Sequence, residues 1–481
     1  MSQPAAAAAG PAEGRRAVIV GGGMAGTRLA RQLAAAGDRV TLVGEEPHAA
    51  YNRVLLADVL AGRYAPDVIR LPDLPAAPAV RALRGVRAVG VDRAARRVRC
   101  DDGRAVPYDV LVLATGAAPV LPPLRGLSGG AGGALPAGVH AFRTLADCLA
   151  LAEAATAGTA AVVVGGGLLG VSAARALALR GARVVLAQQG ERLMERHLDP
   201  AAAGLLRGHL EELGVEVHTG CRVRGVRTSP PPAAGGRRTA ACSSANAAPA
   251  APGGDDEAVP ADRAGSGLAG GARGGGAGGE AASAPAARAV TGVELADGYV
   301  LDARLVVLAC GVRPRAGLAR DAGLGVAEGV VVDDELRTTD PAVHAIGDCA
   351  EHAGVLYGLA APALEQADLL ARILTGPAGH TPRYTGTRVL TRLTLPAADR
   401  PLDLAAFGET EPAPGDDVVH LADATRRVYR KVVVRADRLV GGILLGDLGP
   451  VGALARAWEG GAPLPAGTPL HHLLTDHLGG S

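Results

Sequence analysis

The chain has 481 residues, a formal net charge of +1 at pH 7 and 48% hydrophobic residues, of which few are aromatic. Its nearly neutral charge argues against a nucleic acid or an anionic membrane as partner, because such partners favour a strongly basic face. The apolar runs are shorter than the roughly 18–20 residues that span a bilayer, and the Ala-rich start at 1–14 predicts a disordered leader and a cytoplasmic location.

The first informative element is a dinucleotide-binding fingerprint at residues 17–26, which read AVIVGGGMAG. A β-branched run ends in G-x-G-x-x-G and continues into a predicted helix through Leu29 and Leu33 that ends at Gly37. The glycines permit a tight turn and a close approach to a pyrophosphate, which the helix N-terminus then faces. The fingerprint predicts that a dinucleotide contacts Gly21, Gly23, Met24, Ala25 and Gly26.

Acidic residues after two later strands extend this first site. A strand at 39–43 is followed by Glu45 and Glu46, and either carboxylate is placed to accept a hydrogen bond from a ribose hydroxyl. A strand-to-turn segment at 343–348 ends in Gly347 and Asp348. The alternatives are solvated loop carboxylates for the two Glu residues and an ordinary turn at Asp348. In the dinucleotide interpretation, Asp348 and an adjacent helix N-terminus hold the ribityl and pyrophosphate part of a flavin.

Between these segments we expect a strand pair at 96–99 and 110–114, closed by a sharp turn at Thr115 and Gly116. The fingerprint then recurs at residues 161–170, which read AVVVGGGLLG. A helix at 168–179 and strands at 183–187, 215–219 and 223–227 should follow. Two copies imply two dinucleotides in one chain, which points to a flavin and a nicotinamide that exchange a hydride. The nicotinamide loop would comprise Gly165, Gly167, Leu168, Leu169 and Gly170.

The choice between NADH and NADPH stays open in the sequence. Gln188 occupies the position where a site that prefers NAD usually has Glu. A neutral amide neither accepts well from both ribose hydroxyls nor repels a 2′-phosphate. Arg192 is a candidate to meet that phosphate, the alternative being a solvated loop arginine.

In the later part of the chain, the composition and the predicted elements change at two places. Residues 229–288 are rich in Gly, Ala, Pro and Ser without periodicity, which predicts a disordered insertion in a surface hairpin. Strands resume at 290–295 and 300–308, and a helix is expected at 362–374. Short strands at 389–395, 418–421, 427–434 and 439–445, with a helix at 451–458, indicate a small β-rich domain.

These elements predict an α/β fold with two Rossmann-like three-layer dinucleotide-binding domains and a small C-terminal α+β domain. We place the FAD-binding domain at 15–148 and 310–378 and the NAD(P)-binding domain at 149–309. The C-terminal domain would occupy 382–460, followed by a tail at 461–481.

The six cysteines are Cys100, Cys148, Cys221, Cys242, Cys310 and Cys349. None forms C-x-x-C or another close pair, which argues against a local redox disulfide and against familiar iron–sulfur or zinc spacings. We therefore expect no metal site, and cysteines that are small buried hydrophobes or unreactive surface thiols.

With these motifs placed, the chain resembles the two-dinucleotide flavoprotein disulfide reductase superfamily. Within it, the chain is similar to the flavoprotein portion of assimilatory NAD(P)H nitrite reductase large subunits and to electron-transfer subunits of assimilatory nitrate reductases. The resemblance runs from Arg15 to about Ala457 without the insertion. The matching stretches are 45–53 (EEPHAAYNR), 193–199 (LMERHLD), 311–315 (GVRPR), 345–349 (AIGDC), 384–386 (YTG), 429–431 (YRK) and 439–442 (LVGG).

The resemblance implies that Arg53 lies near the flavin and that Thr115, Gly116 and Asp348 lie along FAD. Gly347 is likewise assigned to the FAD site, and Gly311 is assigned to the nicotinamide dinucleotide. Ser172 departs from the pattern, because relatives usually have Glu there. The chain also lacks the Cys-rich [2Fe–2S] segment and the sirohaem domains of a complete nitrite reductase, so we expect that it does not reduce nitrite by itself.

We therefore expect an FAD-dependent NAD(P)H oxidoreductase that passes electrons to a separate metalloprotein, an assimilatory nitrate or nitrite reductase. The cofactors carry the chemistry, so no side chain is assigned as a catalytic acid or base. One alternative is a ferredoxin or rubredoxin reductase, and another is a non-catalytic flavin- or nucleotide-binding regulator. The oligomeric state is open, with a homodimer as one option.

Overall fold

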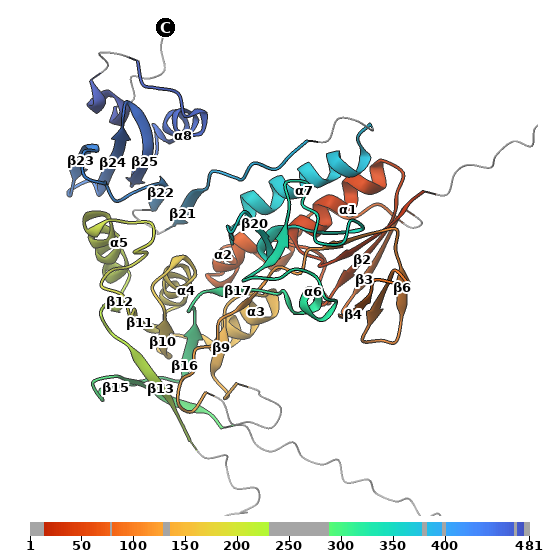
Figure 1. Ribbon diagram of the computed structural model, residues 1–481. Coiled ribbons are helices and arrows are strands. Elements are labelled where there is room, and N and C mark those ends of the chain that lie inside the picture. Colours follow the sequence, from red (N-terminus) through yellow and green to blue (C-terminus); the bar gives the residue numbers. More distant parts are fainter. Residues whose placement is uncertain are drawn as a thin grey trace, which may run out of the picture.

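The computed structural model describes residues 14–76, 79–127, 135–229, 288–377, 382–396, 401–465 and 469–475 (Figure 1). The leader expected at 1–14 and the insertion expected at 229–288 lie outside these ranges except at their ends. Within the described ranges, no helix combines the length and the apolar character needed to cross a membrane.

A five-stranded parallel sheet forms the centre of the first unit. Its apolar strands are buried on both faces, which explains the continuous runs of Val, Ile and Leu in the sequence. The strand order is β19 (Val343–Ala345), β7 (Val110–Leu113), β1 (Arg16–Val20), β2 (Arg39–Gly44), β3 (Val80–Arg84).

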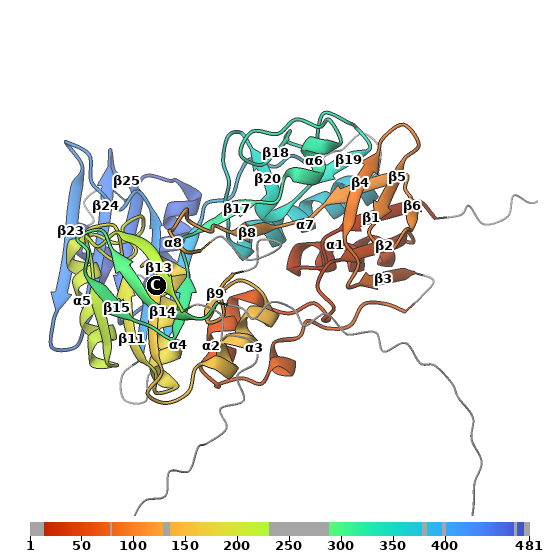
Figure 2. The same ribbon diagram turned by 90° about the horizontal axis from the view of Figure 1, so that it is seen from below.

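Two layers cover this sheet. The helices α1 (Met24–Ala35) and α7 (Ala360–Thr375) lie side by side (Figures 1 and 2), and Asp368 of α7 accepts from Arg28 at 2.7 Å and from Gln32 at 2.7 Å. The other layer is a small antiparallel sheet of β4 (Ala88–Asp92), β5 (Arg97–Cys100) and β6 (Ala105–Pro107). The short elements of this unit are η1 (Arg53–Leu55), α2 (Leu56–Leu60), η2 (Pro66–Ile69), α6 (Gly317–Asp321), β18 (Val330–Val332), η4 (Gly347–Cys349), β20 (Ala350–His352).

A second five-stranded parallel sheet repeats the arrangement. Its order is β12 (Val215–His218), β11 (Arg183–Ala187), β10 (Ala160–Val164), β16 (Leu305–Leu308), β9 (Val139–Ala141). The helices of this unit are α3 (Leu145–Ala154), α4 (Leu168–Leu179) and α5 (Pro200–Glu212), and its antiparallel strands are β13 (Val223–Thr228), β14 (Val290–Leu295) and β15 (Val300–Asp302). Because β9 pairs with β16, this sheet already includes residues that we expected in the first domain, before 149.

The two units are joined by a short two-stranded ribbon. The strand β8 (Ala117–Pro119) leaves the first sheet, and β17 (Val312–Pro314) returns to it, antiparallel to β8. Backbone hydrogen bonds close both ends of the pair, from Val120 N to Gly311 O at 2.9 Å and from Arg315 N to Gly116 O at 2.9 Å.

The C-terminal unit is an antiparallel sheet with one helix, α8 (Val451–Gly460), and a short turn of helix, η5 (Leu470–Leu474). Its strand order is β21 (Leu390–Leu395), β22 (Leu402–Gly408), β25 (Arg438–Leu445), β24 (Val428–Arg435), β23 (Asp417–Asp423). Trp458 of α8 packs against Phe407, with ring centroids 5.2 Å apart. These contacts give the unit its own apolar core.

The C-terminal sheet packs against the second unit, next to α5 (Figure 1). Asp199 caps α5 by accepting from Ala202 N at 3.0 Å, and its other carboxylate oxygen accepts from Tyr429 at 2.6 Å and from Lys431 at 2.9 Å. All three side chains are buried. A buried carboxylate and ammonium that are both hydrogen-bonded fix the docking geometry, because removing either leaves an uncompensated charge.

Two expectations about strands need correction, and several elements were not expected. The segments at 96–99 and 110–114 are strands, but β5 pairs with β4 and β6 whereas β7 pairs with β1 and β19, so they are not partners. The run at 300–308 forms two strands, β15 and β16, in different sheets. The elements that were not predicted are the strands β3, β4, β6, β8, β9, β17, β18, β20 and β22 and the helices α2, α3, α5 and α6.

Candidate functional site

The first glycine loop has a geometry that only glycine satisfies. Gly21 has φ +127°, and a Cβ built on it would lie 1.9 Å from the carbonyl oxygen of Ala114. A Cβ on Gly26 would lie 2.0 Å from the carbonyl oxygen of Gly21. Around Gly23, by contrast, nothing lies within 4 Å of the Cβ position. The loop therefore packs tightly against its own fold at its two ends and leaves free space at its centre.

The second glycine loop repeats this pattern. Gly165 has φ +107°, and its Cβ would lie 2.5 Å from the carbonyl oxygen of Ala309; a Cβ on Gly170 would lie 1.7 Å from the carbonyl oxygen of Gly165. Gly167 again faces free space. Each central glycine precedes a helix, so the first residues of α1, Met24 and Ala25, and of α4, Leu168 and Leu169, present their backbone N–H groups there.

Neither helix has a side-chain cap at its N-terminus, since Gly23 and Gly167 are the N-cap residues. The first-turn N–H groups of a helix carry a partial positive charge and need acceptors. A pyrophosphate supplies such acceptors, so both loops fit a dinucleotide.

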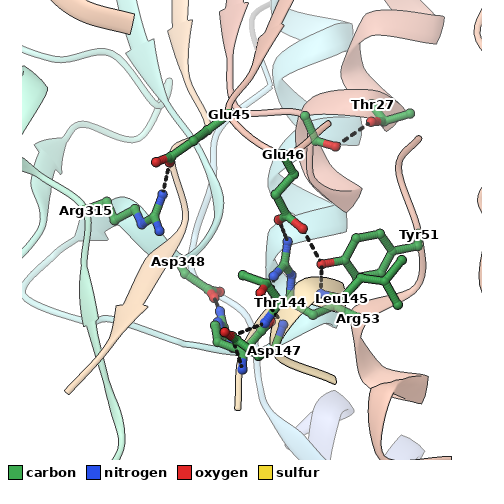
Figure 3. A network of polar contacts seen from close by, with 12 residues as sticks. Thr27, Glu45, Glu46, Tyr51, Arg53, Thr144, Leu145, Asp147, Arg315 and Asp348 are labelled. Atoms are coloured by element: carbon green, nitrogen blue, oxygen red, sulfur yellow. Dashed lines mark hydrogen bonds and ion pairs between the residues drawn. The ribbon is translucent and has the colours of Figure 1, made fainter. Parts of the chain in front are cut away.

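Glu45 and Glu46 follow β2 and point to different partners (Figure 3). Glu45 accepts from Arg315 at 2.5 Å. Glu46 accepts from the Tyr51 hydroxyl at 2.6 Å through one oxygen and from Arg53 at 2.7 Å through the other. Because a carboxylate oxygen has two lone pairs, Glu46 retains acceptor capacity beyond these two bonds.

These contacts continue to Asp348 at the end of β19 (Figure 3). Arg53 also donates to the backbone oxygen of Arg143 at 2.7 Å, and the side chain of Arg143 donates to Asp348 at 2.5 Å. We call Glu46, Tyr51, Arg53, Arg143 and Asp348 the Glu46–Asp348 network. It connects the carboxyl end of β2 with that of β19 through the segment that follows β9.

Within this network, Glu46 and Arg53 hold each other in the ionised form, because each favours the charge of the other. Burial by itself would raise the pKa of Glu46, but the Arg53 guanidinium and the Tyr51 hydroxyl keep that pKa below its usual value. Burial raises the pKa of Tyr51, and the neighbouring Glu46 carboxylate adds to this shift. Tyr51 therefore remains a neutral donor to Glu46, while it accepts from Leu145 N at 2.9 Å.

The remaining residues expected along FAD lie at the same edge of the first sheet. Gly347 has φ +76°, and its N–H donates to the buried Gln366 of α7 at 2.7 Å. Thr115 donates to the backbone oxygen of Arg315 at 2.7 Å. Gly116 and Gly311, at the roots of the ribbon, have φ +68° and +97°, and nothing lies within 4 Å of either Cβ position.

On the nicotinamide side, the structure changes the interpretation of three residues. Gln188 is not a free amide, because its side-chain oxygen accepts from Gly166 N at 2.7 Å. Arg192 is already paired: it donates to Glu411 of the C-terminal unit, whose side chain is 72% exposed, at 2.6 Å and to the Leu198 oxygen at 3.1 Å. Ser172 donates to Leu168 O in its own helix at 2.8 Å.

In the part of the chain that the structure describes, no group of three or more His, Cys, Asp or Glu residues could hold a metal ion. The five described cysteines are free thiols, whereas Cys242 lies outside the described residues. Cys349, next to Asp348, is fully buried, and this burial raises the pKa of its thiol.

Sequence reasoning missed three participants in the site. Tyr51 lies inside the stretch at 45–53, so its position was visible although its role was not. Arg315 ends the stretch at 311–315. Nothing in the sequence around Arg143 indicated its role, because its partner Asp348 lies 205 residues further along the chain.

Comparison with known proteins identifies the family. Residues 15–239 and 276–367 match the pyridine nucleotide-disulphide oxidoreductase family, and residues 401–460 match the rubredoxin NAD+ reductase C-terminal domain. Among solved structures, putidaredoxin reductase in its covalent complex with putidaredoxin has a TM-score of 0.72 at 24% identity, covering 96% of this chain and 98% of that chain. This likeness confirms the expected fold class.

Curated relatives confirm the resemblance noted in the sequence. NAD(P)H nitrite reductase of Bacillus subtilis (strain 168) is 31% identical over 438 residues, which are 90% of this chain and 46% of that protein. The assimilatory nitrate reductase electron transfer subunit of the same strain is 30% identical over 90% of this chain and 48% of that protein. Putidaredoxin reductase of Pseudomonas putida is 30% identical over 75% of this chain and 74% of that protein.

The chain thus spans less than half the length of the nitrite and nitrate reductase relatives. The family match covers both glycine loops and the carboxylates described above. The chain belongs to the pyridine nucleotide-disulphide oxidoreductase family and is an NAD(P)H oxidoreductase with FAD as its second cofactor.

Proposed function

We propose that this chain takes electrons from NADH or NADPH, transfers them to FAD and passes them to a separate metalloprotein, an assimilatory nitrate or nitrite reductase. The observation that carries the proposal is the pair of uncapped glycine loops at the carboxyl ends of β1 and β10 in two parallel sheets, in a chain whose relatives include nitrite and nitrate reductase proteins. When bound, FAD supplies hydride acceptance and one-electron release.

The proposed FAD site uses the first loop and the Glu46–Asp348 network. The N–H groups at the start of α1 and the free space at Gly23 suit the pyrophosphate. Glu45 and Glu46 both remain candidates for the ribose hydroxyl. Arg53 and Arg143 orient Glu46 and Asp348, and Thr115, Gly116 and Gly347 shape the backbone that faces the cofactor.

The proposed nicotinamide site uses the second loop, Gly165 to Gly170, with Gln188 and Gly311 at its rim. The free space at Gly167 and the N–H groups of α4 suit the second pyrophosphate. Gly311 and Gly116 flank the ribbon between the two sheets.

Anaerobic mixing with NADH and with NADPH tests the first step. We expect the flavin absorbance to bleach with at least one dinucleotide. A chain that retains FAD but is bleached by neither would be a non-catalytic flavin- or nucleotide-binding regulator, and the oxidoreductase proposal would be wrong.

Steady-state assays with purified acceptors test the second step. We expect faster turnover with an assimilatory nitrate or nitrite reductase than with a ferredoxin or a rubredoxin. The reverse order would favour a ferredoxin or rubredoxin reductase, a second candidate that the match of residues 401–460 supports. The proposal includes a cytoplasmic location, where the nicotinamide dinucleotides are abundant, and a monomer or homodimer to be distinguished by sedimentation.

A further inference from the structure

The loop after β11 presents a carboxylate beside the residue that usually selects the dinucleotide. In a Rossmann domain, the end of the second strand contacts the adenosine ribose. Gln188 holds this position, but its oxygen already accepts from Gly166 N at 2.7 Å, so its amide nitrogen is the atom left for other partners. A Cβ built on Gly190 would lie 2.7 Å from that nitrogen and 2.0 Å from a carboxylate oxygen of Glu195.

Glu195 therefore supplies, from seven positions further along the chain, the negative charge that Gln188 lacks. It has acceptor oxygens for a ribose hydroxyl, as the usual strand-end acid does. A 2′-phosphate carries a charge of about −1.5 to −2 and would lie against the same carboxylate. The amide nitrogen of Gln188 can donate to either dinucleotide, so it does not oppose this preference.

Arg192, the loop arginine that could pair with a 2′-phosphate, already forms an ion pair with a residue of the C-terminal unit. Arg192 donates to Glu411, in the segment between β22 and β23, at 2.6 Å, and its remaining contact is the Leu198 oxygen at 3.1 Å. The Arg192 side chain is 26% exposed. To bind a phosphate, Arg192 would have to exchange the Glu411 carboxylate for the phosphate, at a loop that carries Glu191 and Glu195 as well as Arg196.

We propose that Glu195, together with the Arg192–Glu411 ion pair, makes this chain select NADH over NADPH. The C-terminal unit thereby takes part in the choice of dinucleotide, although it lies outside the nicotinamide-binding sheet. This inference rests on the proposed assignment of residues 165–170 to the nicotinamide dinucleotide. It is independent of the electron acceptor.

Calorimetric titration of the FAD-loaded protein with NAD+ and with NADP+ tests the inference without turnover. We expect NAD+ to bind at least roughly tenfold more tightly than NADP+. The repulsion between two like charges near a protein surface is large enough to give this difference. Glu195→Gln should tighten NADP+ binding several-fold and weaken NAD+ binding. Glu411→Gln should tighten NADP+ binding by releasing Arg192, and the added Arg192→Ala should abolish that gain.

Glu409→Gln is the matched control, since Glu409 forms a comparable ion pair with Arg435 at 2.8 Å in the same unit. It should leave the ratio of the two affinities unchanged. Equal or tighter binding of NADP+ by the unaltered protein would overturn the inference, as would an unchanged ratio in Glu195→Gln. If the protein bound neither dinucleotide, the assignment of the second loop would fall as well.

Discussion

The ion pair between Arg143 and Asp348 joins the segments that follow β9 and β19, which are strands of different sheets. Both side chains are largely buried, at 15% and 14% exposure, so neither charge is well solvated without the other. Asp348→Asn removes the charge but keeps the shape, and it leaves the Arg143 guanidinium partly unpaired. We expect a loss of roughly 1–3 kcal/mol in the free energy of unfolding and weaker retention of FAD.

The ratio of flavin to protein absorbance after gel filtration measures this retention. Asp109→Asn is the matched control, because Asp109 forms an Arg–Asp pair with Arg16 before β7, at the opposite end of the sheet. It should keep its flavin. Full flavin occupancy in Asp348→Asn would exclude Asp348 from the FAD site.

The close approach at Gly170 makes a second prediction at this scale. A single methyl group there would lie 1.7 Å from the Gly165 oxygen, so Gly170→Ala must push α4 away from the second loop. We expect flavin reduction by NADH at least roughly tenfold slower, with FAD still bound. Stopped-flow absorbance under nitrogen measures the rate.

Gly204→Ala provides the comparison for that variant. Gly204 is an exposed glycine of α5 with nothing within 4 Å of its Cβ position, so alanine should stabilise the helix by roughly 0.5–1 kcal/mol. An unchanged reduction rate in Gly170→Ala would show that this loop does not hold the nicotinamide dinucleotide.

Single residues of the site could be predicted where the motif that identifies them lies within a short stretch of sequence. The glycines could be found because each turn needs glycine within ten residues of sequence. The partners of Glu45 and Asp348 could not, since Arg315 and Arg143 lie 270 and 205 residues away from them. Arg192 was either a candidate for a phosphate or a solvated loop arginine, and its ion pair with Glu411, 219 residues away, could not be foreseen from position 192.

The strand β19 contains a titratable group that the site does not use. His344 is 3% exposed, and burial lowers its pKa to about 4, well below the usual 6.5. Below pH 6.5 the unfolded chain therefore binds a proton that the folded chain does not. The free energy of unfolding should fall by up to about 3 kcal/mol as the pH drops from 6.5 to 4.

Urea unfolding at several pH values measures this dependence. His344→Gln should remove that part of the slope, whereas His420→Gln, at an exposed position of β23, should retain it. Identical slopes for the unaltered protein and His344→Gln would show that His344 is protonated as easily in the folded state as in the unfolded chain.

The hairpin of β13 and β14 gives a prediction about the insertion. The two strands are antiparallel and pair as far as Thr228 with Val290. Replacing residues 230–287 by a short Asn-Gly turn should preserve the fold, because closing a shorter loop costs less entropy. We expect unchanged FAD content and dye-reductase activity. Loss of either in a soluble variant would mean that the segment contacts the rest of the chain.

Most of the elements that the sequence predicted lie within one or two residues of their expected bounds, because apolar runs and glycine ends are local features, but many elements, most of them short, were not predicted. The helix α4 and the strands β11 and β14 match their expected bounds. Strand partners were less predictable. The strands β5 and β7 lie in different sheets, and the sequence pattern of a strand does not indicate which other strands it pairs with. The strand β22 was missed because Ala405 and Ala406 interrupt its alternation with small residues.

For the molecule as a whole, the buried thiols lead to a prediction about the route by which electrons leave the flavin. Burial raises the pKa of Cys349 and of Cys310, so both remain protonated and are poor nucleophiles. The double variant Cys349→Ala, Cys310→Ala should therefore keep NAD(P)H-driven reduction of a one-electron dye within about twofold of the unaltered protein.

Cys100→Ala, in the small antiparallel sheet, controls for the loss of a buried sulfur. A loss of turnover in the double variant, with FAD bound and bleached normally, would show that a thiol carries the electrons. The direct transfer from flavin to a metalloprotein would then be wrong.

The ribbon of β8 and β17 has a mechanical consequence. Both passages of the chain between the two parallel sheets run through residues 117–119 and 312–314, which pair with each other as one antiparallel ladder. Pro119 and Pro314 restrict the backbone at opposite ends of that ladder. The two sheets are consequently held together both by this backbone ladder and by the packing of α2 of the first unit against α3 and α4 of the second. Substitutions on the outer surfaces of either sheet should therefore leave the relative placement of the two glycine loops unaltered.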